Sequence, residues 1–433
     1  MKNITTTKTI LFASLIAAMI LPFSMMNIAD AIQDNNQRME AKKQNIANLG
    51  DKMQALSVKI FDLEATLANL ESEENVDEQE SIKKTLAAAY GELDRLQAKA
   101  YKLFEIPEKR YQKLLEVKQQ ILEEYDDTGM IDDIFIDHSD ESIQVILYSD
   151  YFESHKDTVK SKADSIASKK PATPADDVGD IKVGIKHFTP SAIMASDEAC
   201  AGVGSGNSGY NQICNKATIS FPATKSSVNG FVTVGHALQE GLNTYPSNAI
   251  DQLPVYQPGP ADTNGNGIGV VPTGQSLTDL NWQAQILGTL SYGVYDASQN
   301  EDAAFVKLSL GKTVNKEVDI NGATYNIASY LTGNPTIGHY VYKSGLATGT
   351  TFGFVQSVNT DGVYASYTQC KGDSGSPVGT VLGADFTFYG MHLGTVGSGP
   401  FFNQPSCSGS DTYSKFMTYS TIVNQIGVTG QTQ

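Results

Sequence analysis

The sequence predicts a multidomain protein with a helical N-terminal region, a small α/β unit and an all-β C-terminal domain. Three observations predict this order. Apolar residues recur at helical spacing between Ile46 and Leu103, the spacing becomes strand-like after Ile131, and short β-type runs separated by turn residues follow Cys200. A chain of 433 residues is also too long for one ordinary domain.

Residues 1–31 have the layout of a secretory signal. Lys2 and Lys8 give a positive start, residues 10–26 are mostly apolar, and small residues precede a cleavage site after Ala31. We therefore expect a secreted protein. The alternative is a retained segment that anchors the protein at the cell surface, because the apolar stretch is long for a signal; only in that case would a membrane be a partner.

Residues 32–127 predict helices with two a/d seams. The first seam consists of Ile46, Leu49, Met53, Leu56, Ile60, Leu63, Leu67 and Leu70, and the second of Ile82, Leu86, Ala89, Leu93, Leu96, Ala100 and Leu103. Two seams joined by a polar link predict either an antiparallel helical hairpin or a coiled coil through which chains self-associate. The sequence does not choose between these alternatives.

Residues 128–190 predict a small α/β unit. Strands are expected at 134–136, 143–147 and 181–185, with a polar helix at 151–168. Residues 191–433 are rich in Gly, Ser, Thr and Asn and contain regularly spaced short β-type runs, which are typical of an all-β barrel or sandwich.

Three motifs in the C-terminal domain point to nucleophilic catalysis. A β-type run ends at Gly235-His236, Asp302 opens another apolar strand, and Ser374 lies between glycines in the motif Gly-Asp-Ser-Gly. A serine hydroxyl needs a base and an orienting acid, and these residues supply both. Asp296 is a competing acid, but it lacks the apolar strand that follows Asp302.

These motifs resemble those of the chymotrypsin-like serine peptidases of the streptogrisin and α-lytic type. They occur in that family's order, 66 and 72 residues apart (302 minus 236 and 374 minus 302), and residues 341–349 are similar to a further family segment. The resemblance implies two antiparallel β-barrels with His236 as base, Asp302 as orienting acid and Ser374 as nucleophile. It also implies an oxyanion hole formed by the N–H groups of Gly372 and Ser374, and protein or peptide substrates.

The chain departs from the family pattern at Val234, where alanine is usual, and at Ala237, where many members have cysteine. A small α/β unit directly before such a domain resembles the prosegments of this family. We therefore expect a zymogen from which residues 32 to about 190 are removed, with a permanent adaptor domain as the alternative.

One wall of the substrate pocket is expected at residues 389–394. His392 in this segment is similar to a histidine of glutamyl endopeptidases, and Lys371 could add positive charge, so Lys371, His392, Leu393 and Gly394 are candidate substrate-binding residues. Leu393 replaces the serine that is common at its position. Together these residues predict cleavage after Glu.

The four cysteines all lie in the C-terminal part, which predicts disulfides in an exported protein. Three pairings are possible. The short loop that it would close favours a disulfide between Cys200 and Cys214, and the resemblance to the family, which has a bridge near the nucleophile, favours one between Cys370 and Cys407.

No cofactor and no metal site is expected. The segment Asp262 to Gly267 has oxygen ligands at calcium-loop spacing, but Thr273 stands where an EF-hand loop requires glutamate. A net charge of -17 argues against nucleic acid as a partner.

The main alternative to a protease is a catalytically silent protease-like binding module on a coiled-coil stalk. An α/β-hydrolase esterase is disfavoured because its triad order would be reversed. In relatives the carboxylate before the nucleophile has a cationic partner, and the sequence does not identify such a partner for Asp373.

Overall fold

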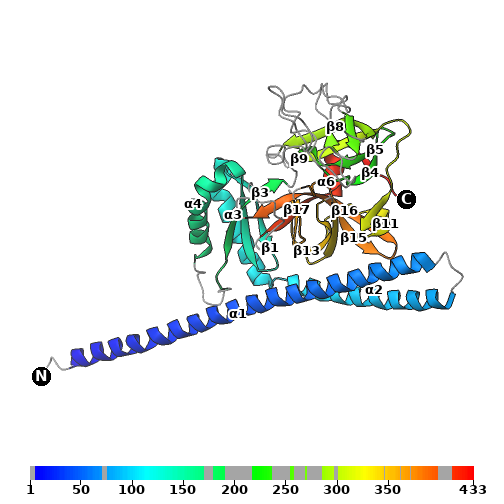
Figure 1. The fold of residues 1–433 in the computed structure, drawn as a ribbon. Coiled ribbons are helices and arrows are strands. Elements are labelled where there is room, and N and C mark those ends of the chain that lie inside the picture. Colours follow the sequence, from blue (N-terminus) through cyan, green and yellow to red (C-terminus); the bar gives the residue numbers. More distant parts are fainter. Residues whose placement is uncertain are drawn as a thin grey trace, which may run out of the picture.

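The structure is a computed structural model, shown in Figure 1. It describes residues 5–70, 76–169, 179–190, 217–236, 254–257, 269–270, 285–296, 301–345, 347–360, 362–370, 372–397 and 412–433. Residues 5–36, 126, 149, 189–190, 254–257, 269–270 and 285–287 are described by their backbone only. Cys200, Cys214, Lys371, Cys407 and the 262–267 loop, for which the sequence made predictions, lie outside these residues. Within the described part, no helix is long and apolar enough to cross a bilayer.

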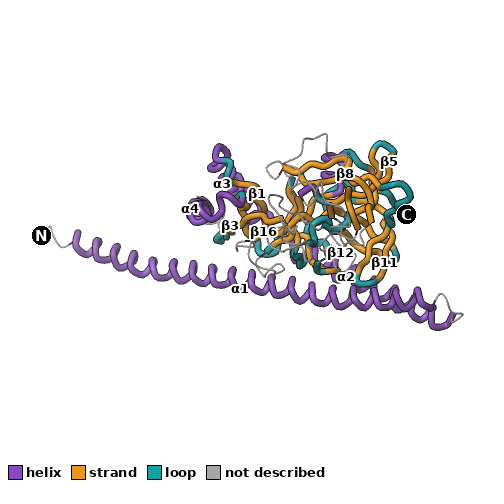
Figure 2. The backbone as a smooth tube through the Cα atoms, turned by 45° about the horizontal axis from the view of Figure 1, so that its top comes forward, coloured by secondary structure: helices purple, strands orange, loops and turns teal. Residues whose placement is uncertain are grey.

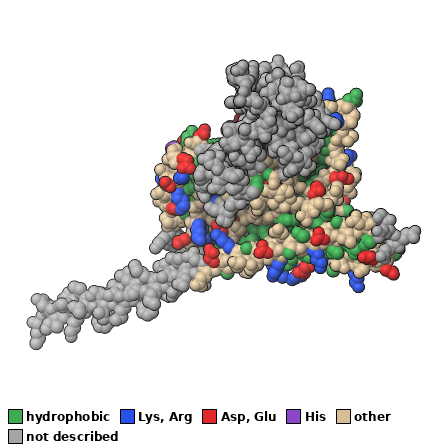
Figure 3. All heavy atoms as spheres, viewed as in Figure 1, with side chains coloured by type: hydrophobic (Ala, Val, Ile, Leu, Met, Phe, Trp, Pro, Cys, Tyr) green, Lys and Arg blue, Asp and Glu red, His purple; other side chains and the backbone are tan. Residues whose placement is uncertain are grey.

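The helical N-terminal region is confirmed and forms a hairpin. Helices α1 (Thr5–Leu70) and α2 (Val76–Phe104) lie antiparallel and side by side, while the N-terminal part of α1 projects away (Figures 1 and 2). Seam residues of both helices are buried, among them Met53, Ile60, Leu96 and Ala100. Charged side chains of both signs lie along the outer face of the hairpin (Figure 3). Self-association through a coiled coil stays a prediction.

The α/β unit includes a helix of the predicted helical region, α3, and in the described residues contains three strands and two helices. Its elements are α3 (Glu108–Tyr125), the short 3₁₀ turn η1 (Asp126–Thr128), β1 (Ile131–Asp137), β2 (Ser142–Leu147), α4 (Ser149–Ala167) and β3 (Val183–Pro190). β1 and β2 are antiparallel, and β2 and β3 are parallel. Apolar side chains of α3, α4 and the strands form a core of their own. β3 runs to Pro190 instead of ending at residue 185.

Six strands of the C-terminal domain close into an antiparallel barrel. In spatial order these are β12 (Tyr340–Gly345), β13 (Gly349–Asn359), β14 (Gly362–Ala365), β17 (Tyr413–Thr418), β16 (Asp385–Gly397) and β15 (Pro377–Leu382). The ring is closed because β16 pairs with both β15 and β17, and β15 pairs with β12. The predicted β-barrel is therefore confirmed for this half of the domain.

The other half of the domain is an antiparallel sheet of seven strands. In spatial order these are β18 (Thr429–Gly430), β4 (Phe221–Lys225), β5 (Val228–Thr233), β9 (Glu301–Leu308), β8 (Gln285–Asp296), β6 (Pro254–Gln257) and β7 (Gly269–Val270). This sheet does not close within the described residues, so the second barrel stays a prediction. Helix α6 (Tyr419–Ile426) packs on β9, and the hairpin of β10 (Glu317–Ile320) and β11 (Ala323–Tyr330) joins β16.

The α/β unit is continuous with the barrel rather than separate from it. β3 pairs with β16, so that β1, β2 and β3 extend the barrel's hydrogen-bonded network into one sheet of 11 strands. The sequence did not predict this connection.

The helical hairpin shares a hydrophobic core with the barrel. Phe61 of α1 is 2% exposed, and its ring centroid lies 5.7 Å from that of Tyr325 and 5.8 Å from that of Tyr342. Ser57 hydrogen-bonds the hydroxyl of Tyr342 at 3.1 Å, and Gln97 of α2 donates to the carbonyl of Gly338 at 2.8 Å. The hairpin therefore covers barrel side chains that would otherwise be exposed to water.

Phe61→Ala should destabilise the folded chain by about 3–5 kcal/mol, because it removes a buried aromatic ring and leaves a cavity against the barrel. Denaturant unfolding followed by tyrosine fluorescence would measure this change. The exposed neighbour Asp62 provides the control, since Asp62→Ala should change stability by less than about 0.5 kcal/mol. Equal stability of the two variants would show that the hairpin does not support the barrel.

Candidate active site

His236 follows the end of β5, and the glycine before it allows a close approach of two strands. A Cβ atom on Gly235 would lie 2.1 Å from the carbonyl oxygen of Val294 in β8, which no side chain could tolerate. The chain can therefore turn tightly against β8 at this point. His236 is 2% exposed, so its imidazole lies within the domain.

Asp302 reaches His236 because β5 and β9 are antiparallel neighbours, with Thr233 opposite Ala304. Its Oδ1 accepts the backbone N–H of His236 at 2.8 Å, and its Oδ2 lies 2.6 Å from the ring Nδ1. Together the two contacts hold the ring and place a proton on Nδ1, which leaves Nε2 as a hydrogen-bond acceptor. Asp302, and not the competing Asp296, makes these bonds.

Ser374 lies in a tight turn between β14 and β15 that depends on glycine. Gly375 has a φ of 88°, and a Cβ atom there would lie 2.2 Å from the carbonyl oxygen of Thr218. The Ser374 Oγ lies 3.1 Å from the Nε2 of His236 and 3.1 Å from the carbonyl oxygen of Leu393. The three predicted side chains are thus joined in one hydrogen-bonded series.

The predicted oxyanion donors lie on the same turn. Gly372 has a φ of 101°, which turns the backbone ahead of Asp373 and Ser374. In the described part of the chain, the N–H groups of Gly372 and Ser374 donate to no protein acceptor. Their role as donors to an oxygen atom that gains negative charge stays a prediction.

Asp373 has a cationic partner that the sequence did not identify. Its carboxylate lies 2.7 Å from the Nζ of Lys343, and both side chains are fully buried. The same carboxylate accepts the Thr348 hydroxyl at 2.7 Å and the N–H groups of Ala347 and Cys370, both at 2.9 Å. Burial alone would raise the pKa of Asp373, but Lys343 and these donors outweigh it and hold the pKa below its ordinary value.

A signal for this pair was present in the sequence. Lys343 follows Val341 and Tyr342 in an apolar β-type run, where a charged side chain needs a partner if the strand is buried. The missing information was the pairing of β12 with β15, which places Lys343 opposite Val378 beside the nucleophile turn.

The candidate substrate-binding residues that the structure describes make contacts of different kinds. His392 is completely buried, its Nδ1 lies 3.0 Å from the hydroxyl of Tyr367, and its ring also hydrogen-bonds the backbone of Lys415. Burial lowers the pKa of His392 to about 3, so the ring is neutral at pH 7. The Leu393 carbonyl contacts Ser374, and Gly394 pairs with Pro190 of β3.

Cys370 is disulfide-bonded. Its partner lies outside the described residues, so the pairing of Cys370 with Cys407 stays a prediction. Within the described residues, no group of three or more His, Cys, Asp or Glu side chains could hold a metal ion.

Comparison with known proteins gives only distant structural similarities. A glutamic-acid-specific serine protease, described as using a histidine triad in substrate binding, is 21% identical and matches 50% of this chain and 93% of its own at a TM-score of 0.33. Thermobifida fusca protease A is 18% identical, with 52% and 95% covered and a TM-score of 0.32. Nocardiopsis protease is 19% identical, with 49% and 91% covered and a TM-score of 0.32.

No family model and no curated protein matches the chain. The part of the chain that matches these proteases is about half of its length.

Lys343→Met should destabilise the protein by about 3–5 kcal/mol, because it leaves the buried Asp373 carboxylate without its cation. Chemical denaturation would measure the loss. Combining it with Asp373→Asn should recover much of the stability, since the double variant buries no charge. A single variant as stable as the parent chain would show that the pair does not hold the nucleophile turn.

Proposed function

We propose that this chain is a serine endopeptidase that cleaves peptide bonds through an acyl-enzyme. The observation that carries the proposal is the hydrogen-bonded series from Asp302 through His236 to Ser374. A base with a free acceptor nitrogen lies within hydrogen-bond reach of a hydroxyl, and a carboxylate holds that base in the required tautomer.

The geometry supports the following proton transfers. As Ser374 Oγ attacks the substrate carbonyl carbon, its proton passes to Nε2 of His236, and Asp302 stabilises the resulting imidazolium. The N–H groups of Gly372 and Ser374 bind the developing oxyanion. His236 then gives the proton to the leaving amine, and a water molecule hydrolyses the acyl-enzyme by the same route.

The hydroxyl of Ser374 has two acceptors in this structure. Its single proton can be donated either to His236 Nε2 or to the Leu393 carbonyl, each 3.1 Å from the oxygen. Only the first orientation prepares the oxygen for attack. A substrate that uses the Leu393 carbonyl would remove the competing acceptor and favour the reactive orientation.

The alternative is a catalytically silent protease-like binding module. The presence of all three side chains in contact favours the enzyme, since a binding module needs no base 3.1 Å from a buried hydroxyl. Protein or peptide substrates follow from the proposed reaction.

Export and processing belong to the same proposal. The signal-like residues 1–31 support secretion, or attachment to the cell surface if they are retained, and the α/β unit before the barrel supports a zymogen whose residues 32 to about 190 are cut away. One observation favours the permanent adaptor instead, because the hairpin shares a core with the barrel. The N-terminal sequence of the exported protein would distinguish removal from retention.

The preference for Glu is carried by the sequence resemblance alone. Within the described residues, the His392 ring hydrogen-bonds Tyr367 and the backbone of Lys415, which is the arrangement of a core histidine. Lys371, the other proposed contact for an acidic side chain, lies outside the described residues.

Ser374→Ala should abolish labelling by a fluorophosphonate and lower kcat for casein hydrolysis by about 10⁶-fold, because the nucleophile is lost. Ser309→Ala, which changes a half-buried serine just after β9, is the matched control and should leave both readouts unchanged. Equal behaviour of the two variants would favour the binding module.

If the acidic preference holds, a peptide with Glu before the cleaved bond should be hydrolysed with a higher kcat/KM at pH 7 than the same peptide with Gln. The pair differs mainly in charge, so the ratio isolates electrostatic recognition. A ratio near one, or a preference for aromatic or basic residues across a peptide library, would contradict the prediction.

A further inference from the structure

A cavity separate from the candidate active site lies near the nucleophile turn. Its volume is about 940 Å³, and the described residues that line it fall within 218–222, 313–322 and 344–350, with Pro377 as a further member. Because β10 supplies one wall, it is named the β10 cavity. None of His236, Asp302 and Ser374 lines it.

The wall formed by β10 is acidic. Glu317 and Asp319 line the cavity, while Val318 and Ile320, which alternate with them along the strand, are buried in the hydrophobic core. Alternate residues of a strand point to the same face and are about 7 Å apart, so the two carboxylates lie side by side along the wall. Among the described lining residues there is no Lys, Arg or His, so no cation of the cavity neutralises this wall.

A buried hydroxyl group belongs to the same lining. Ser220 is only 3% exposed, and in the described part of the chain its Oγ has no hydrogen-bond partner. The backbone N–H of Ser220 donates to the carbonyl oxygen of Val232 at 2.8 Å, so the residue is fixed beside β5. Its hydroxyl can therefore accept a hydrogen bond from an occupant of the cavity that carries N–H groups.

Apolar side chains lie between these polar groups. Ile219, Val314 and Pro377 line the same cavity. A divalent metal ion would need several oxygen atoms that converge on one point, whereas the carboxylates here are spread along a strand. A linear polyamine matches the lining better, because its ammonium groups are separated by three or four methylene groups, a length similar to the spacing of the two carboxylates.

The β10 cavity touches the residues that hold the nucleophile turn. Thr348 lines it, and the Thr348 hydroxyl donates to the Asp373 carboxylate at 2.7 Å. Thr218 also lines it, and its N–H donates to the carbonyl oxygen of Ser374 at 2.8 Å. Gly345 lies so close to Asp373 that a Cβ atom there would be 2.3 Å from Oδ1. An occupant that packs against these residues would therefore restrict movement of the turn.

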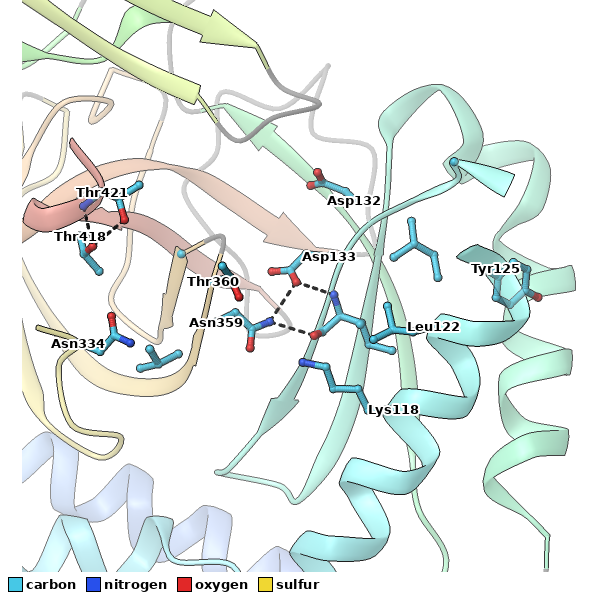
Figure 4. Close-up of a pocket in the computed structure, with 15 residues that line it drawn as sticks. Lys118, Leu122, Tyr125, Asp132, Asp133, Asn334, Asn359, Thr360, Thr418 and Thr421 are labelled. Atoms are coloured by element: carbon cyan, nitrogen blue, oxygen red, sulfur yellow. Dashed lines mark hydrogen bonds between the residues drawn. The ribbon is translucent and has the colours of Figure 1, made fainter. Parts of the chain in front are cut away.

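The cavity between the α/β unit and the barrel has a different chemistry (Figure 4). The carboxylate of Asp133 there accepts the backbone N–H of Ile134 at 2.7 Å, the amide of Asn359 at 3.0 Å and the hydroxyl of Tyr364. These bonds tie the unit to the barrel. Lys118 also lines this cavity and would repel a cation, so a polyamine is expected to prefer the β10 cavity.

We propose that the β10 cavity binds a linear polyamine and that the bound polyamine stabilises the nucleophile turn. Glu317 and Asp319 bind its ammonium groups, the Ser220 hydroxyl accepts one of its N–H groups, and its methylene groups lie against the apolar lining. The binding does not depend on the proposed function. The effect on the turn rests on that function, because it makes occupancy of the cavity increase the reactivity of Ser374.

Isothermal titration calorimetry of the full chain with spermidine tests the binding, in a Ser374→Ala background that prevents self-digestion. Spermidine should bind at one saturable site, more weakly as the salt concentration rises. The double variant Glu317→Gln/Asp319→Asn, which keeps the side-chain shapes and removes both charges, should weaken the affinity by about tenfold or more.

The matched control is Glu116→Gln/Asp385→Asn, which removes two exposed carboxylates outside the cavity and should bind spermidine as the parent does. Both double variants change the net charge of -17 by the same amount. General attraction of a polycation to an acidic chain therefore cannot produce a difference between them. Equal affinity of the two double variants for spermidine would overturn the site.

The rate of labelling by a fluorophosphonate, in chains that keep Ser374, tests the effect on the turn. Saturating spermidine should raise this rate by about fivefold or more in the parent and in the control variant, and leave it unchanged in Glu317→Gln/Asp319→Asn. Binding without a change in labelling would confirm the site and refute its effect on the turn. Binding in the absence of labelling of any chain would confirm the site and refute the protease proposal.

Discussion

The buried ion pair of Lys343 and Asp373 is the interaction on which the candidate site depends. Neither side chain is exposed, so each would be costly to bury without the other. Asp373 lies between Gly372 and Ser374, and its carboxylate is tied to Lys343 in β12 and to backbone donors at Ala347 and Cys370. The turn that carries the nucleophile is thereby fixed to the barrel wall.

The register of the strands also determines the geometry of the candidate site. The base, the acid and the nucleophile come from β5, β9 and the turn before β15, and they meet because each strand has one allowed alignment with its neighbours. A slip of one residue between β5 and β9 would turn Asp302 to the other face of the sheet. Both strands are buried on both faces, with Phe231, Val232, Phe305 and Val306 enclosed, so such a slip would require the core on either side of the sheet to repack.

The three candidate side chains that the structure brings together and the β-rich domain could be predicted from the sequence because each depends on a local pattern. His236, Asp302 and Ser374 each lie in a short motif, and the helical seams repeat over many turns.

Lys343 could not be assigned, because its partner is set by a pairing between distant strands. Phe61 lies outside the a/d seam of α1. An apolar residue outside the seam indicates that α1 packs against a second partner besides α2, and in the structure this partner is the barrel. The last residues of β3, Lys-His-Phe-Thr-Pro, show no alternation of apolar and polar side chains, so this part of the strand could not be predicted. Its extended conformation is defined by pairing with β16.

The shared core of hairpin and barrel has a consequence for any cut in the connection between the α/β unit and the barrel. Phe61 and Phe104 would stay packed against barrel aromatics after the peptide bond is broken, because no covalent link is needed for those contacts. The product would be a nicked, two-chain particle, in which the projecting end of α1 still travels with the barrel (Figure 1).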